Sequence, residues 1–219
     1  MKYRSALLLL FVIILIDQVV KVYVKTHFHN QEEVMVAGNW FRLHFLENKG
    51  MAFGMELSES PTGKFLLTFF RLIAVVAGFF ILKNLVRKGY SRGLIICGSL
   101  ILAGALGNLI DSLFYGLIFT SSDFHLASLV APGHGYGTLF HGRVVDMLYF
   151  PLYDGTWPKW VPKLGGHPFQ FFEPVFNIAD ASISVGVIAL VIFQKRLLRR
   201  NEVQQPEFKA TEQAELGHS

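Results

Sequence analysis

Four apolar stretches of nearly bilayer length are spaced along this chain of 219 residues. About 20 residues of helix are needed to cross a hydrocarbon core roughly 30 Å thick. The stretches that approach this length cover residues 5–24, 65–82, 94–115 and 178–193. Hydrophobic residues make up 52% of the chain and charged residues only 16%, a balance unusual for a soluble protein. We therefore expect a membrane all-α protein with four transmembrane helices.

Basic residues flank these stretches in a pattern that predicts how the chain is oriented. They cluster before the first stretch, between the second and third, and after the fourth. The residues are Lys2, Arg4, Lys83, Arg87, Lys88, Arg92, Lys195, Arg196, Arg199 and Arg200. Since cytoplasmic segments carry the excess of Lys and Arg, we expect both termini in the cytoplasm and the long links, residues 25–64 and 116–177, outside. The same distribution argues against nucleic acid as the partner behind the net charge of +4.

The chain is expected to form a single integral membrane domain over residues 1–200. The tail, residues 201–219, is polar and acidic and is expected to be disordered in the cytoplasm. The first stretch is similar to a secretion signal, but it continues through Asp17, Gln18 and Lys21 without a cleavage site, so we expect a retained helix. Cys97 is the only cysteine, so no intrachain disulfide can form.

The outer links carry two further patterns. Apolar and polar residues alternate over residues 41–45, which predicts a short strand in a small extracytoplasmic sheet. Residues 47–50 are typical of a turn, and residues 51–55 of a second strand or a loop. The second link is rich in aromatic residues, which either lie at the lipid headgroups or line a groove for an acyl chain. They include Trp157, Trp160, Phe169, Phe171 and Phe172.

Polar side chains inside the apolar stretches are costly, from about 2.5 kcal/mol upward for an ionised one at mid-helix, so each needs a reason. They are Asp17, Lys21, Arg71, Asn108, Asp111, Asn177 and Asp180. The first and third stretches run outward and the fourth runs inward. Three separate helices therefore bring carboxylates or amides to one layer near the outer face of the membrane.

Spacing assigns some of these side chains a structural role. Asp17 and Lys21 are four residues apart, which predicts a structural ion pair on one helix face. Gly and Ala residues before Asn108 allow another helix to approach closely. Arg71 either extends toward the headgroups or pairs with an acid, and we assign it no catalytic part. Asp146, in the apolar run 142–148 of the outer link, is the possible partner of Asp180.

Five motifs give the chain a family resemblance. They are residues 16–18 with Lys21, then residues 47–54, 104–111, 142–146 and 176–180. In this order they resemble lipoprotein signal peptidase, the bacterial signal peptidase II family, over about residues 5–196. The resemblance implies that Asp146 and Asp180 are the catalytic aspartates of an aspartic endopeptidase. It implies substrate-binding or supporting roles for Asn48, Gly50, Asn108, Asp111, Arg143 and Asn177.

The resemblance also implies substrate, inhibitor and location. The substrate is a prolipoprotein whose lipobox cysteine already carries diacylglycerol, cut just before that cysteine to remove the signal peptide. The inhibitor globomycin is expected to occupy the same site. The protein is expected in the bacterial cytoplasmic (inner) membrane, as a multi-pass monomer among membrane lipid, with its active site facing the periplasmic side. No cofactor and no metal are expected.

The residues fit this chemistry without the family. Peptide hydrolysis by two carboxyl groups needs one ionised, to take a proton from water, and one protonated, to polarise the scissile carbonyl. Two acids close together in a site of low dielectric do not readily both ionise. The proton belongs to the pair, so neither aspartate is assigned it from sequence.

The chain departs from the family in two places. Ser112 follows Asp111 where the family motif usually continues with arginine, so that role passes to Arg143, Arg71 or Lys21, or is absent. The stretches 116–141 and 149–175 are longer than is usual for the family.

Other functions fit the sequence less well. A proton-coupled transporter uses buried acids, but here they are bunched near one face and the spans show no repeat. A membrane metallohydrolase or lipid transferase lacks support because there is no His-Glu-x-x-His. The histidines considered, which are scattered through outer links, are His27, His29, His125, His134, His141 and His167. Ser182 and Ser184 lack a nearby histidine and no Gly-x-Ser-x-Gly is present, which argues against a serine hydrolase. A purely structural scaffold would not need Asp146 and Asp180 together.

Overall fold

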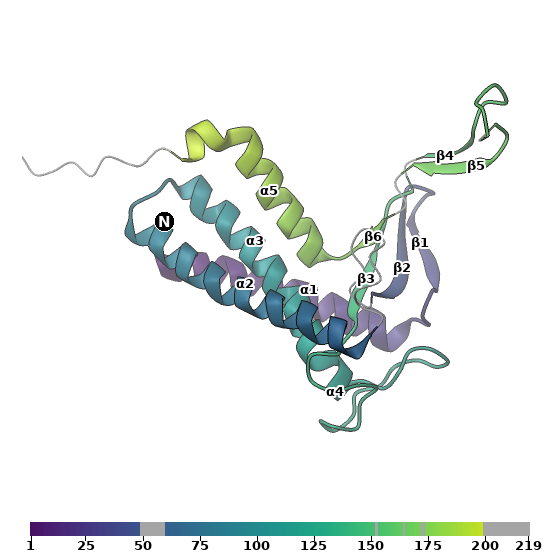
Figure 1. Cartoon of the computed structure of the whole chain (residues 1–219), viewed down its shortest axis with the longest axis horizontal. Coiled ribbons are helices and arrows are strands. Elements are labelled where there is room, and N and C mark those ends of the chain that lie inside the picture. The colour runs from purple at the N-terminus through teal and green to yellow at the C-terminus, as the bar shows by residue number, and fades with distance from the viewer. Residues whose placement is uncertain (49–59, 152, 164, 172–173, 199–219) are drawn as a thin grey trace, which may run out of the picture.

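The computed structural model describes residues 1–48, 60–151, 153–163, 165–171 and 174–198. Four long helices form a bundle, and a small sheet lies at one end of it (Figure 1). The helices are α1 (Tyr3–His27), α2 (Pro61–Arg87), α3 (Arg92–Ile110) and α5 (Ile178–Leu197). The third span continues from α3 through a π-helical turn, η2 (Asp111–Tyr115), into the short α4 (Gly116–Ile118). All four spans are long and apolar enough to cross a membrane.

Each span is longer than the apolar stretch that predicted it, and capping side chains mark where three of the helices begin. Ser60 caps α2 by accepting a hydrogen bond from the Gly63 amide at 3.0 Å, and proline occupies the first turn. Ser91 caps α3 in the same way. Asn177 caps α5 in a reciprocal arrangement with Asp180. The last cap places a candidate site residue at a helix start.

The third span is the centre of the bundle. Half of its most apolar window is buried, against 22%, 17% and 17% for the other three spans. Glycines on α3 allow the close contacts: a Cβ on Gly104 would lie 2.1 Å from the Ala179 carbonyl oxygen, and one on Gly107 would lie 2.9 Å from an Asp17 carboxylate oxygen. The predicted close approach of another helix before Asn108 is therefore present, with α5 on one side and α1 on the other.

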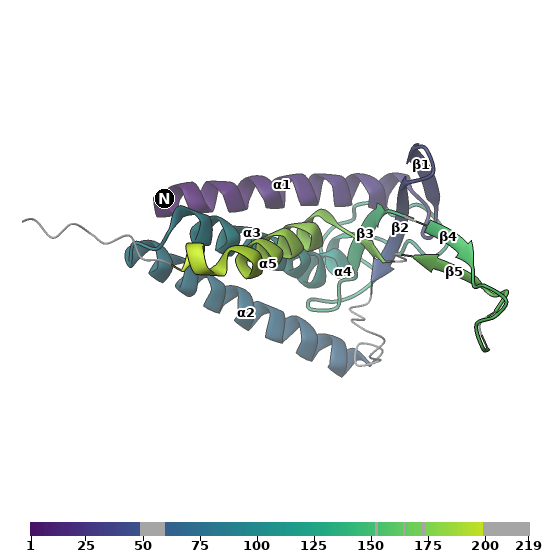
Figure 2. The ribbon, with the colours of Figure 1, turned by 90° about the horizontal axis from the view of Figure 1, so that it is seen from above.

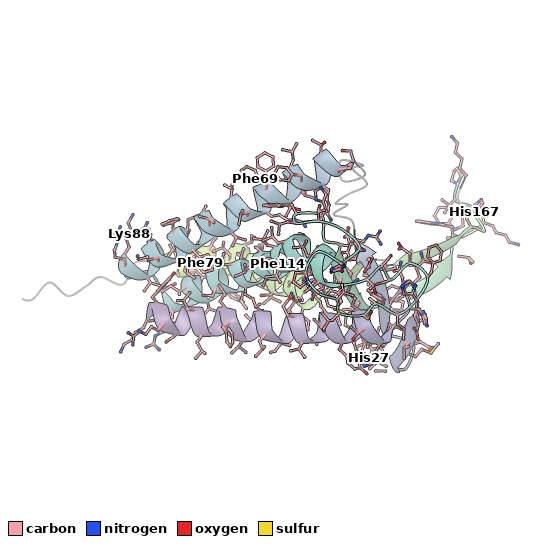
Figure 3. The ribbon with its side chains drawn as sticks, turned by 90° about the horizontal axis from the view of Figure 1, so that it is seen from below. His27, Phe69, Phe79, Lys88, Phe114 and His167 are labelled. Atoms are coloured by element: carbon pink, nitrogen blue, oxygen red, sulfur yellow. The ribbon has the colours of Figure 1, made fainter. Side chains whose placement is uncertain are left out.

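The two ends of the bundle differ in character. The N-terminus, the turn between α2 and α3 and the last turn of α5 lie at one end, and the sheet lies at the other (Figure 2). Figure 3 shows the same division, with Lys88 at the first end and His27 near the sheet. This arrangement is the one that four alternating spans require. Which of the two ends faces the cytoplasm stays a prediction from the basic residues.

The four-stranded sheet is antiparallel, in the order β1 (Glu33–Ala37), β2 (Phe41–Asn48), β3 (Val144–Tyr149) and β6 (Val175–Phe176). The predicted strand at residues 41–45 and the small sheet are thus present. The predicted turn is wrong for Glu47 and Asn48, which remain in β2 and pair with Val145 and Val144. The rest of that turn and the predicted second strand or loop at residues 51–55 lie outside the described residues.

The sequence interpretation missed β3 and treated Asp146 as a loop residue. Almost every residue of β3 is buried, so the strand shows no polar–apolar alternation that would reveal it. Val145 and Met147 pack in an apolar cluster with Val24, Phe45 and Tyr115. That cluster fastens the sheet to the helix ends. Because successive strand residues face opposite sides, it also turns Asp146 to the other face of β3.

A separate two-stranded hairpin, β4 (Tyr153–Thr156) and β5 (Pro168–Phe171), projects sideways from the sheet (Figure 1). Trp160, in the turn of this hairpin, is 81% exposed. The other long stretch, residues 119–142, folds back on the end of the third span. Its Gly137 amide donates to the Gly116 carbonyl at 2.8 Å, and its Gly142 amide donates to the Ser112 carbonyl at 2.9 Å.

Candidate functional site

Asp146 lies in the middle of β3, where it is 5% exposed. Two amide side chains hold its carboxyl group. Asn177 donates from Nδ2 to Oδ1 at 2.7 Å, and Asn48 donates from Nδ2 to Oδ2 at 3.3 Å. Asn48 comes from the neighbouring strand and Asn177 from the start of α5. The Asp146 side chain is therefore fixed by residues far away in the sequence.

Asp180 lies in the first turn of α5, three residues after the cap. Its backbone amide donates to Asn177 Oδ1 at 2.8 Å, and its Oδ2 accepts from the Asn177 amide at 3.4 Å. Its other oxygen, Oδ1, accepts from Asn108 Nδ2 at 2.7 Å. The capping box thus fixes the backbone at Asp180, and α3 fixes its carboxylate.

Asn108 and Asn177 join the two acids. Asn177 Nδ2, which bonds Asp146, also donates to Asn108 Oδ1 at 3.1 Å. A continuous hydrogen-bonded path therefore runs from Asp146 through Asn177 and Asn108 to Asp180. We refer to Asp146 and Asp180 as the aspartate pair. The path links the two carboxyl groups within a largely buried layer.

The surroundings of Asp146 favour its protonated form. Burial, and second the nearby charge of Asp180, raise the pKa of Asp146 to about 7. The amide donors of Asn177 and Asn48 oppose this rise. A carboxyl group with a pKa near neutrality both holds and releases a proton at physiological pH. This is the property that general acid–base chemistry requires.

Below the pair, Lys21 is the hub of a second polar layer, which we call the Lys21 cluster: Lys21, Asp17, Asp111 and Gln18. The Lys21 ammonium contacts Asp17 at 3.0 Å and Asp111 at 2.8 Å. It also donates to Asn108 Oδ1 at 2.9 Å. Lys21 thus makes the ion pair expected from its spacing and in addition orients the amide that bonds Asp180.

The acids of the Lys21 cluster reach backbone groups next to the pair. Asp17 Oδ1 accepts from the Ala179 amide at 2.9 Å, and Asp111 Oδ2 accepts from the Val145 amide at 3.3 Å. Ala179 precedes Asp180 and Val145 precedes Asp146. The cluster therefore sets the backbone position of both members of the pair.

Gln18 is a member of this cluster that sequence reasoning did not assign to the site. It donates to Asp111 Oδ1 at 2.8 Å and to Asp17 Oδ2 at 3.2 Å, and its Oε1 accepts from the Tyr115 hydroxyl at 3.2 Å. Its place inside an apolar helix between Asp17 and Lys21 was the available signal, because a buried amide needs partners.

Arg143 faces a different set of acids, which we call the Lys25 cluster: Lys25, Glu47, Ser122, Asp123 and Arg143. Among the residues that the structure describes, Arg143 forms ion pairs with Glu47 and Asp123, each at 2.9 Å. Glu47 also pairs with Lys25. Arg143 therefore supports the loop and the end of β2 rather than bonding the aspartate pair. Glu47 and Lys25 were missed as supporting residues, and Gly50 lies outside the described residues.

The π-helical turn explains why glycine occupies position 142. The turn starts at Asp111, and a Cβ on Gly142 would lie 2.0 Å from the Asp111 carbonyl oxygen. Such turns frequently mark functional sites because they displace side chains from the regular helical register. Here the close approach of Gly142 brings the start of β3, and with it Asp146, against α3.

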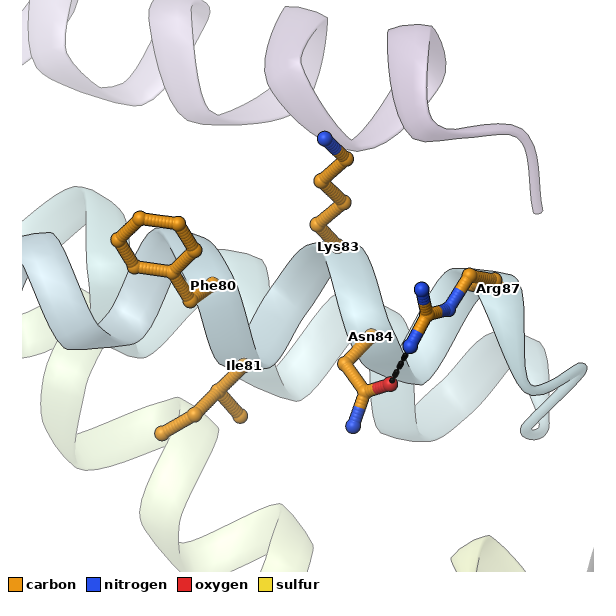
Figure 4. A pocket seen from close by; sticks show the side chains of 5 residues that line it. All are labelled: Phe80, Ile81, Lys83, Asn84 and Arg87. Carbon is orange, nitrogen blue, oxygen red and sulfur yellow. Dashed lines mark hydrogen bonds between the residues drawn. The ribbon is translucent and has the colours of Figure 1, made fainter.

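Other features lie away from this layer. In the described part of the chain, no group of three or more His, Cys, Asp or Glu side chains is arranged to hold a metal ion. A surface hollow of about 450 Å³ is lined by Phe80, Ile81, Lys83, Asn84 and Arg87 (Figure 4). All five residues belong to the far end of α2, so this hollow is unconnected with the aspartate pair.

The fold and the site together define a multi-pass membrane protein with a buried, hydrogen-bonded pair of acids at one end of its bundle. The chain belongs to the signal peptidase II family, because the family described as Signal peptidase (SPase) II matches residues 9–195. It is therefore a member of a family of peptidases.

Similar proteins agree with this membership. The lipoprotein signal peptidase of Porphyromonas gingivalis is 47% identical over 196 residues, covering 89% of this chain and 84% of its own. That of Amoebophilus asiaticus is 40% identical over 204 residues, covering 91% and 80%. A bacterial membrane enzyme solved by the in meso method at 2.3 Å resolution has a TM-score of 0.56 at 25% identity, covering 92% of this chain and 96% of that one.

Proposed function

We propose that this protein is an aspartic endopeptidase that removes the signal peptide from prolipoproteins. The proposed cut lies just before a cysteine that carries diacylglycerol. The observation that carries the proposal is the path from Asp146 through Asn177 and Asn108 to Asp180. Membership of the signal peptidase II family supports it, as do relatives described as lipoprotein signal peptidases.

The proposed reaction uses the pair in two protonation states. One carboxylate takes a proton from water, whose oxygen attacks the scissile carbonyl carbon. The other, protonated, donates a hydrogen bond to the carbonyl oxygen as the tetrahedral intermediate forms. The C–N bond then breaks, and a proton passes from the pair to the departing amine. Asn108 and Asn177 hold the carboxyl groups at fixed positions through both steps, so no reorganisation is needed.

The proposed location follows from the same layer. The aspartate pair lies where the sheet meets the helix ends, and a diacylglyceryl anchor would hold a cysteine at that depth of a bilayer. The basic clusters favour a cytoplasmic position for the other end of the bundle, which would direct the pair to the periplasmic side of the inner membrane. An apolar groove of about 330 Å³ between α2, α3 and α5 would suit an apolar segment of a signal peptide.

The decisive experiment is cleavage of a diacylglyceryl-modified prolipoprotein by the purified protein in detergent. Asp146→Asn and Asp180→Asn should each lower kcat/KM by at least about 1,000-fold, because each removes an acid–base group while keeping its size. Glu33→Gln is the matched control, since it makes the same acid-to-amide change on the outer strand β1. Wild-type cleavage should be blocked by globomycin and unaffected by chelator. Full activity in either aspartate variant would exclude the pair as the catalytic groups.

A further inference from the structure

The inner face of α2 carries a polar stripe that points at the site. Lys64, Thr68 and Arg71 follow one another at helical spacing, and Lys64 and Thr68 are buried. The Thr68 hydroxyl contacts the Phe140 carbonyl at 2.9 Å, which ties the stripe to the outer loop. Arg71 lies one turn deeper. An arginine in an apolar span is costly, so its position demands a partner.

In the described part of the chain, the Arg71 side chain bonds Ser112. Arg71 NH1 donates to Ser112 Oγ at 3.0 Å. Ser112 Oγ in turn donates to the Asn108 carbonyl at 2.9 Å, and the Asn108 side chain bonds Asp180 at 2.7 Å. Arg71 thus reaches the aspartate pair through two residues of one helical turn. Ser112 is the position where the family motif usually carries arginine.

The charges around Arg71 point the same way. Asp180, then Asp111 and Asp146, are the carboxyl groups that act on its guanidinium. Lys21 approaches from α1, and its ion pairs go to Asp17 and Asp111. Figure 2 shows α1 and α2 on opposite sides of α3 and α5. Lys21 and Arg71 therefore belong to helices on opposite sides of α3 and α5.

We propose that Arg71 is a positioning residue for the aspartate pair, supplying from α2 the positive charge that Ser112 does not supply from α3. Its guanidinium, fixed by the Ser112 hydroxyl, favours the singly ionised state of the pair and holds the Asn108 turn in place. This inference rests on the proposed function, since it concerns the charge state needed for hydrolysis. Of the alternatives left open by Ser112, Arg143 is engaged with Glu47 and Asp123.

The sign of the effect on pH dependence follows from Coulomb's law. A cation favours the ionised form of a nearby acid, so removing Arg71 raises the pH at which the base of the pair ionises. Lys21 from α1 acts on Asp146, and the two aspartates and Asp111 act on Arg71. Asp17 from α1 pairs with Lys21, and Arg71 acts on Lys64 from α2. Arg71→Met and Arg71→Gln remove only this charge, so a shift of the pH profile in these variants reports it.

The test is kcat/KM against pH for cleavage of a lipidated prolipoprotein by the full chain. In Arg71→Met and Arg71→Gln, the rise of kcat/KM on the acidic side of the pH profile (the acidic limb) should move to higher pH by about 0.5–1 unit. The maximal kcat/KM should fall by about 10-fold or more. Arg71→Lys should leave the limb in place because it keeps the charge. Ser112→Ala should also leave the limb in place and lower the maximum only a few-fold. A merely structural role would lower the rate at every pH equally.

Thermal unfolding in detergent checks that each variant is folded. If Arg71→Met does not fold, Arg71→Gln decides, because its amide can still bond Ser112. An acidic limb at the wild-type position in the folded uncharged variants overturns the proposal, and so does a limb that moves equally in Arg71→Lys. Loss of cleavage in Asp146→Asn and Asp180→Asn upholds the proposed function independently of these results.

Discussion

Two buried lysines one turn apart on α1 form similar ion pairs but hold different parts of the molecule. Lys21 and Lys25 are both fully buried, and each pairs with a carboxylate from a distant segment, Asp111 for Lys21 and Glu47 for Lys25. The Lys21 cluster bonds Asn108 and the backbone beside both aspartates. The Lys25 cluster joins Glu47 and Ser122, and the Lys25 ammonium lies over the rings of Phe119 and Tyr136.

The difference lies in what each cluster holds. The Lys21 cluster connects α1, α3 and α5 directly beneath the aspartate pair, so a change there reaches the reacting groups. The Lys25 cluster connects α1 with the end of β2 and with the loop of residues 119–142. A change there therefore acts first on the packing of that loop and strand end. The clusters therefore predict a larger cost for Lys21 than for Lys25 in both catalysis and stability, because Glu47 keeps Arg143 and Ser122 as partners when Lys25 is removed.

The largest expected effect is that of Lys21→Met. It leaves Asp17 and Asp111 buried without a cation, which should cost about 3–5 kcal/mol of unfolding free energy. Cleavage should fall by at least about 100-fold, because Asn108 also loses its donor. Chemical denaturation in detergent and the prolipoprotein assay measure the two losses. The double variant Lys21→Met/Asp17→Asn should regain part of the stability and none of the activity; recovery of activity would contradict the assigned coupling.

The next effect concerns pH and Asp146. Since the folded protein raises the pKa of Asp146 from 3.8 to about 7, the folded state binds more protons than the unfolded chain between these values. Ionised Asp146 therefore destabilises the fold progressively as pH rises from about 4 to about 7. Asp146→Asn should be more stable than wild type at pH 8, by at most about 4 kcal/mol, and indistinguishable from it below pH 4.

Unfolding midpoints of wild type and Asp146→Asn across pH 3.5–8 measure this difference. Glu33→Gln, on the outer strand, provides the comparison for acid-to-amide changes outside the pair. A stability gap that stays constant with pH would show that the gain does not come from ionisation of Asp146.

The smallest expected effect is that of Lys25→Met. Glu47 keeps Arg143 and Ser122 as partners, so the variant should lose only about 1–3 kcal/mol. Cleavage should fall by less than about 10-fold, because the aspartate pair and its amides are untouched. The same two assays as for Lys21→Met make the comparison direct. A loss of cleavage as deep as that of Lys21→Met would erase the distinction between the clusters.

Much of the fold was predictable because bilayer-length apolar runs leave a chain few alternatives. The four helices follow from these runs, and the strand at residues 41–45 follows from the alternation of apolar and polar residues. The strand β3 did not, since a short run buried on both faces lacks alternation. Glu47 and Asn48 also have the composition of a turn, and only their pairing with Val145 and Val144 keeps them in β2.

The sequence by itself determined the spans, the placing of acids and amides in one layer, and the family motifs. The tertiary structure alone decided the partners: Asn177 and Asn108 joining Asp146 to Asp180, Arg143 turning to Glu47, and Arg71 reaching Ser112. The physical reason is that side-chain partners separated by dozens of residues are set by how helices pack. Hydrophobic period and capping residues indicate where a helix lies along the chain, but not which of its polar atoms meet.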